Sequence, residues 1–188
     1  MTSATMSAPI SHELHAKAEA MSLPAEEPTH VEGLSMVVFS GDLDKVLAAF
    51  IIANGAAAMD LPVSMFFTFW GLNVLRRGGH IKVAKKKTTM ESMFGAMMPN
   101  GPAGLQLSKL KMGGLGTRLI KREMAKKHVD DLAHLIRSAQ EQGVRFIACT
   151  MSMDLMGIRK EELIDGLTFG NVGSFIDAAD RSRMTLFI

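Results

Sequence analysis

The sequence predicts an α/β protein, a three-layer α/β/α sandwich around a mostly parallel five-stranded sheet. Short uninterrupted apolar runs, typical of strands buried on both faces, alternate with amphipathic helical patterns. The run 34–39 leads through a turn into a helical pattern and then into the run 62–70, which is the strand–helix–strand order of a parallel sheet. With 188 residues and 47% hydrophobic content, the chain is long enough for one such domain.

The expected domain follows a short tail. Residues 1–30 are small and polar and contain three prolines, so we expect a flexible N-terminal tail and a folded domain over 31–188. The tail lacks the basic and apolar regions of a signal peptide. In the domain, the first strand covers 34–39, and Asp42 or Asp44 is placed to cap the next helix.

The remaining elements follow from the same patterns. Apolar residues at helical spacing, or in short runs bounded by turn residues, mark each of them. We expect helices over 43–59, 117–127, 129–139, 159–164 and 172–179, and strands over 62–70, 144–149, 167–169 and 184–188.

The charge is unevenly distributed along the chain. Residues 76–127 hold 13 Lys and Arg against 2 Asp and Glu, a net charge of +11, whereas the rest holds 8 basic and 17 acidic residues, a net charge of −9. This basic segment, also rich in Met and Gly, is predicted to be a loop region that is either a solvated connection or an attraction for anions. Its cations Lys109, Lys111 and Arg118 are our candidates for attracting a small anion. Few aromatic residues accompany them, so we expect no nucleic-acid partner.

A membrane hairpin over 46–75 is a competing interpretation of the apolar runs. These runs are shorter than the roughly 20 apolar residues that a spanning helix needs, and Asn54, Asp60 and Pro62 interrupt them. We therefore expect a cytoplasmic protein, with membrane association as the less favoured alternative.

Cys149 is the only cysteine, which excludes a disulfide or dithiol within one chain. It ends the expected strand 144–149, and ligands of parallel α/β sheets gather at the carboxyl ends of strands. Because free cysteines are also among the most buried residues, position alone favours a reactive and a structural thiol equally. Thr150 and Ser152, in the expected loop 150–157, are candidates to donate hydrogen bonds to a sulfur anion.

Methionine is unusually frequent, with 16 residues. Thioethers and a thiolate together suit Cu(I), but methionine more often fills irregular core space, so we expect no metal and no cofactor. The methionines considered for copper are Met93, Met97, Met112, Met151, Met153 and Met156.

Three blocks of sequence, at 98–102, 107–117 and 147–158, resemble the DsrE/DsrF/DsrH-like family, in the branch often labelled "peroxiredoxin family protein". The likeness extends over about Leu34 to Ile188. It implies a homo-oligomeric α/β/α domain in sulfur trafficking, whose cysteine carries sulfane sulfur as a persulfide or thiosulfonate. The family motif A-C-x-M-S-M-D-x-M-G assigns that role to Cys149. Some relatives have a second, upstream cysteine that this chain lacks.

The resemblance favours a sulfur carrier or sulfurtransferase. Cys149 would be its reactive residue, and the substrate-binding candidates are Thr150, Met151, Ser152, Met153 and Gly157. The expected partners are small sulfur anions such as thiosulfate and a thiol protein such as a TusA-like carrier. With one thiol per chain, sulfur must leave to another protein or subunit. The alternative is a non-catalytic interaction protein, peripheral to a membrane, with a structural cysteine.

Overall fold

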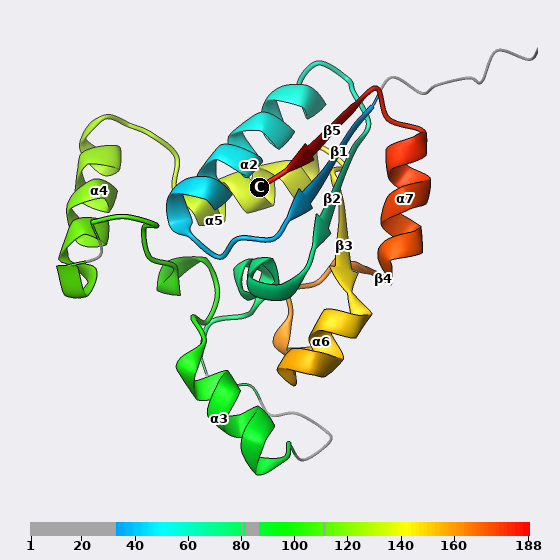
Figure 1. Cartoon of the computed structure of the whole chain (residues 1–188). Helices are drawn as coiled ribbons and strands as arrows, with labels where there is room; N and C mark the ends of the chain where they lie inside the picture. The colour runs from blue at the N-terminus through cyan, green and yellow to red at the C-terminus, as the bar shows by residue number, and fades with distance from the viewer. Residues whose placement is uncertain (1–32, 80, 82–86, 111) are drawn as a thin grey trace, which may run out of the picture.

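A computed structural model describes residues 33–79, 81, 87–110 and 112–188 (Figure 1). The expected tail 1–30 lies outside these residues. The chain forms five strands, six α-helices and four short 3-10 helices in this part: β1 (Leu34–Val38), α2 (Leu43–Ala57), β2 (Val63–Phe67), η1 (Phe69–Leu75), α3 (Thr89–Met97), η2 (Pro102–Gly104), η3 (Met112–Gly114), α4 (Leu115–Lys126), α5 (Leu132–Glu141), β3 (Arg145–Cys149), α6 (Thr150–Met156), η4 (Lys160–Glu162), β4 (Thr168–Gly170), α7 (Val172–Asp180) and β5 (Met184–Phe187).

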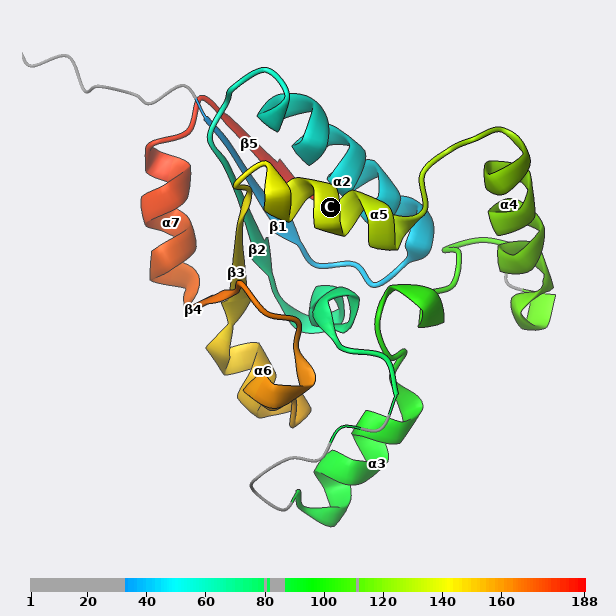
Figure 2. The same cartoon turned by 180° about the vertical axis from the view of Figure 1, so that it is seen from behind.

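The five strands form one parallel sheet in the order β4-β3-β2-β1-β5. Helices cover both of its faces, with α2 and α5 on one side and α7 on the other (Figures 1 and 2). The predicted α/β/α sandwich with a parallel five-stranded sheet is therefore confirmed. Because every strand runs in the same direction, all the carboxyl ends lie along one edge of the sheet.

The main core lies between the sheet and the pair α2 and α5, which pack against each other. Alternate residues of each strand point to this side, as the pleat requires. Phe50 of α2, Phe67 of β2 and Phe146 of β3 are almost fully buried there, and the Phe146 ring meets each of the other two edge to face, with centroids 5.6 Å apart. This packing explains why the strands have uninterrupted apolar runs.

A smaller cluster lies on the opposite face, under α7. Val37, Phe66 and Ile147 of neighbouring strands meet there, and Phe175 of α7 packs against them. Its ring lies 5.5 Å from that of Phe66, measured between centroids. One helix on this face, against two on the other, gives the sheet a thinner cover on the side of α7.

The structure corrects three expectations at the carboxyl edge. The strand expected over 62–70 ends at Phe67, because the chain turns into η1 with Gly71 so close to β1 that a Cβ there would lie 2.0 Å from the Val38 carbonyl oxygen. The loop expected over 150–157 is mostly the helix α6. The helix expected over 159–164 is only the three-residue turn η4.

The basic segment contains α3, η2, η3 and α4, of which α4 stands away from the sheet (Figures 1 and 2). Its stretch after η2 is fixed to the start of α2: Leu43 N–H donates to Gln106 O at 2.8 Å, and the Asp44 carboxylate accepts from the Ser108 N–H and hydroxyl at 2.8 and 2.6 Å. Partial burial raises the pKa of Asp44, but these hydrogen bonds outweigh it and leave that pKa below its ordinary value.

Among the described helices, none combines the length and the apolar character that crossing a membrane requires.

Candidate functional site

Cys149 ends β3, and α6 begins at the next residue. It pairs with Gly170 of β4, so the thiol lies at the carboxyl edge of the sheet, between the ends of β2 and β4. A strand that turns directly into a helix leaves its last residue at the junction, with backbone dihedrals that are still extended. The prediction that the only cysteine ends a strand is thus confirmed.

The thiol is buried in apolar surroundings. Cys149 is 3% exposed and belongs to the cluster of Val37, Phe66 and Ile147 that Phe175 of α7 covers. It follows Ile147 by two residues and so points to the same face of the sheet. In this conformation, the sulfur is shielded from solvent, on the face of the sheet that α7 covers (Figure 1).

The two hydroxyls next to Cys149 are already hydrogen-bonded. The Ser152 side chain is fully buried, and its Oγ lies 2.8 Å from Oγ1 of Thr68, which directly follows β2. Thr150 Oγ1 donates to the Gly170 carbonyl at 3.2 Å. These bonds fix the first turn of α6 between β2 and β4, so in this conformation the hydroxyls position the helix that carries Cys149.

The other residues of the motif are distributed around α6. Met151 is exposed, whereas Met153 is buried in the main core. Gly157 ends the helix with a φ of +64°, and a Cβ there would lie 2.6 Å from the Glu91 side chain of α3. Gly157 therefore terminates α6 and admits α3, one helix length away from the thiol.

Of the expected anion-attracting residues, only Arg118 can be placed relative to the helix α6 that follows Cys149. Lys109 and Arg118 are exposed, and Arg118 is on α4, which lies on the opposite side of the molecule from α6 in both views (Figures 1 and 2). Lys111 lies outside the described residues. Of the methionines considered for copper, Met93, Met97 and Met112 are exposed, as is Met151, while Met153 and Met156 are buried. The described residues contain no group of three or more His, Cys, Asp or Glu placed to hold a metal ion.

Different cations of the basic segment meet at η4, the turn that follows α6 in the chain. The Glu162 carboxylate pairs with Arg76 Nη2 at 3.4 Å and Lys87 Nζ at 2.7 Å, and it accepts from the Arg159 N–H at 2.8 Å. Burial raises the pKa of Glu162, but Lys87, the Arg159 N–H and the charge of Arg76 together hold it below its ordinary value. Arg159 also pairs with Glu91 of α3 at 2.7 Å.

Sequence reasoning missed this ion-pair cluster, together with the role of Thr68. Arg76 opens the basic segment, and Glu162 follows Glu161 in the polar stretch after the cysteine motif. Sequence patterns offered little to predict this pairing, because Arg76 and Glu162 lie 86 positions apart in the chain. The cluster joins η4 to α3, which packs against α6, whereas the pair of Thr68 and Ser152 fixes the first turn of α6.

The fold and site define a class: a parallel α/β domain with a single thiol at the carboxyl end of a central strand. The model of the DsrE/DsrF/DrsH-like family matches residues 30–187, and the chain belongs to this family. It is 48% identical over 154 residues to "Uncharacterized protein YrkE" of Bacillus subtilis, covering 82% of this chain and 95% of that protein. It is 34% identical over 160 residues to "Sulfur carrier protein DsrE2" of Allochromatium vinosum, covering 82% and 97%. The crystal structure of the ychN protein from E. coli aligns with a TM-score of 0.49 at 12% identity, covering 84% of this chain and 99% of that one. The family membership makes this a protein of a sulfur-relay family.

Proposed function

We propose that this chain is a sulfur carrier, or a sulfurtransferase, that holds sulfane sulfur on Cys149 and relays it to a thiol of a partner protein. The observation that carries the proposal is the place of the only cysteine at the carboxyl end of β3, in a chain of this family. The 34% identity to a protein named as a sulfur carrier supports it.

The chemistry is two successive thiolate displacements. The Cys149 thiolate attacks the sulfane sulfur of a donor persulfide; the new sulfur–sulfur bond forms as the donor's own sulfur–sulfur bond breaks, and the donor leaves as a thiolate. With a polythionate donor, the same attack gives a thiosulfonate on Cys149 and releases a sulfur oxyanion. In the second step, a partner thiolate takes the outer sulfur, and Cys149 leaves as a thiolate.

Neither step needs an oxidant or a reductant, because each sulfur–sulfur bond that forms replaces one that breaks; the group that leaves is a thiolate, or a sulfur oxyanion when the donor is thiosulfate or a polythionate. The chain therefore needs no cofactor for this reaction, and it needs no second cysteine of its own. It does need a partner that supplies the accepting thiol, for which a TusA-like carrier or a second subunit of a homo-oligomer is our proposal. Thiosulfate and related sulfur anions are the proposed small-molecule donors.

Burial of Cys149 imposes an opening step before transfer. The thiol belongs to the cluster against which Phe175, in the first half of α7, is packed. The Gly170 carbonyl that accepts a hydrogen bond from Thr150 lies just before α7. This bond therefore links the first residue of α6 to the segment that leads into α7, at the edge of the site. A persulfide formed there and covered again would be protected from water and from competing thiols.

The experiment is intact-protein mass spectrometry after incubation with tetrathionate or polysulfide. We expect one sulfur adduct on the intact chain, no adduct on Cys149→Ser, and transfer of the label to an added thiol protein. A matched control is the double substitution Cys149→Ser with Met151→Cys, which places an exposed thiol two residues along α6. If this control is labelled and transfers as well as the intact chain, the reactivity belongs to any accessible thiol and the proposed role of Cys149 is wrong.

The second candidate is a non-catalytic interaction protein with a structural cysteine, and the burial of Cys149 favours it. In that case, alkylation of Cys149 under native conditions is far slower than in denaturant and no adduct forms at any donor concentration. Alkylation and adduct formation measured side by side separate the two candidates, because a relay needs the thiol to open on the timescale of transfer.

A further inference from the structure

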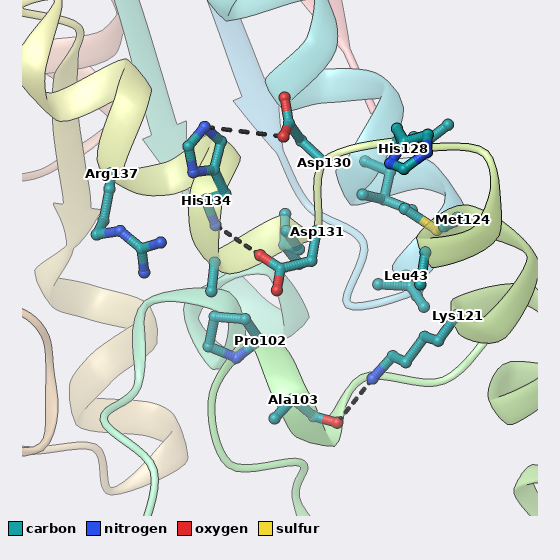
Figure 3. A pocket seen from close by; sticks show the side chains of 15 residues that line it. Leu43, Pro102, Ala103, Lys121, Met124, His128, Asp130, Asp131, His134 and Arg137 are labelled. Atoms are coloured by element: carbon teal, nitrogen blue, oxygen red, sulfur yellow. Dashed lines mark hydrogen bonds and ion pairs between the residues drawn. The ribbon is translucent and has the colours of Figure 1, made fainter.

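A pocket of about 670 Å³ separates α4 from the body of the molecule (Figure 3). Its walls come from the start of α2, from η2, from the end of α4 with the turn that follows, and from the first turns of α5. Pockets of this size accommodate small organic molecules. It lies beside α2 and α5, whereas Cys149 faces α7, so it is separate from the thiol site.

The floor of this pocket is apolar. Leu43 and Leu132 are nearly fully buried beneath it, and Leu47, Met124 and Val129 complete the apolar lining. Met124 belongs to α4, and the others belong to the body or to the connection between the two. An apolar group in the pocket would therefore contact the body and the projecting helix together.

The acidic groups at the rim are already engaged. Asp131 Oδ1 accepts from the His134 N–H at 2.7 Å and so caps α5. Asp130 Oδ1 lies 3.8 Å from Nε2 of the same His134 (Figure 3). Asp131 is thus bonded to α5, and Asp130 lies beside an imidazole of the same helix, whereas Arg137 has no carboxylate partner in the described part of the chain.

Two cations line the rim. Lys121 of α4 donates to the Ala103 carbonyl at 3.0 Å. Arg137 of α5 is exposed and, within the described part of the chain, makes no hydrogen bond or ion pair. Its guanidinium offers five N–H donors in a planar arrangement that suits a carboxylate or a related oxyanion.

We propose that this pocket binds an organic anion with an apolar body, its anionic head on Arg137 and its body on the floor formed by Leu43, Leu47 and Leu132. A medium-chain carboxylate has this chemistry. The apolar floor favours ligands with an apolar body, and the Arg137 guanidinium favours ligands with an anionic head. Because Met124 and Lys121 are part of the wall, a bound anion also links α4 to the body.

The test uses decanoate as the probe, measured by calorimetry on the full chain, with decanol as the neutral probe of equal length. We expect decanoate to bind more tightly than decanol. The substitution Arg137→Gln should weaken decanoate by about 10-fold, the size of one charge-assisted hydrogen bond, and leave decanol unchanged. The matched control is Arg118→Gln, an exposed arginine of α4 that does not line the pocket.

A second variant tests the location of the body. Ala133→Trp places a large ring at a lining residue of α5 and should remove binding of both probes, while urea unfolding shows that the chain still folds. Three results would each overturn the proposal: no binding of decanoate, equal binding of decanoate and decanol, or an equal loss of affinity in Arg118→Gln and Arg137→Gln.

Discussion

The sheet with its covering helices and the basic segment 76–127 differ in how deeply their side chains are buried and in which contacts hold them in place. In the sheet, β1 to β3 are almost completely buried, and aromatic side chains pack in the core beneath α2 and α5. In the basic segment, α4 leaves Leu115, Leu119 and Ile120 exposed, and its Lys121 donates a hydrogen bond to Ala103 of η2 within the same segment. The difference is that hydrophobic burial holds the thiol's strand in place, whereas the segment is attached by the buried side chains of Met98, Leu105 and Leu107 together with hydrogen bonds and ion pairs, and its helix α4 stays largely exposed.

The largest expected effect tests that difference directly. Phe146→Ala removes a ring that is 1% exposed and should lower the free energy of unfolding by about 3–5 kcal/mol, because it loses apolar burial and leaves a cavity. Leu119→Ala on α4 removes a side chain that is 54% exposed and should change it by no more than about 0.5 kcal/mol. Urea unfolding measures both. Equal losses would mean that α4 is part of the same core.

The next prediction concerns the ion pairs that join the two regions. Glu162→Gln leaves the buried Arg76 without its carboxylate, and we expect a loss of about 3 kcal/mol in the free energy of unfolding. Asp165→Asn is the control, because Asp165 pairs with Arg77 from a side chain that is 92% exposed, and exposed pairs contribute about 0–1 kcal/mol. A cost in Glu162→Gln no larger than in the control would show that the buried ion pairs contribute little to holding the segment.

A smaller effect is expected at the near end of α6. Ser152→Ala leaves the buried Thr68 hydroxyl without its partner, which should lower the free energy of unfolding by about 1–3 kcal/mol. Since the bond fixes the helix that begins after Cys149, alkylation of Cys149 should also become faster. The control Ser92→Ala alters an exposed hydroxyl of α3 and should change neither quantity. An unchanged alkylation rate in Ser152→Ala would mean that α7 alone limits access to the thiol.

The smallest expected effect is a dependence on pH. The pKa of Glu162 is lower in the folded chain than its ordinary value of 4.5, so its ionised form stabilises the fold fully above that value. This contribution is lost as the pH falls from 4.5 through the lowered pKa of the folded state. We expect thermal unfolding temperatures to fall in this interval for the intact chain and to fall less steeply for Glu162→Gln. Parallel curves would assign the acid sensitivity to other carboxylates.

Much of the fold was predictable because local patterns encode it. The apolar runs around Met36, Phe66 and Ile147 are buried strands as expected, and Asp131 caps α5 close to the predicted start of that helix. The turn at η1 was missed, because the close approach of Gly71 to Val38 depends on two segments distant in sequence. The helix α6 was missed because its methionines and polar residues show no long periodicity over seven residues.

The sequence by itself determined the fold class, the single thiol and its place at the end of a strand, because apolar runs and their periodicity are properties of neighbouring residues. Only the tertiary structure decided that Cys149 is buried in the cluster under α7, that the helix α4 with Arg118 stands away from α6, and that Arg76 and Lys87 meet Glu162 (Figure 1). The physical reason is that burial of a given side chain and pairing of a given charge depend on which segments the sheet brings together. The spacing of charged residues along the sequence does not show which residues they will pair with.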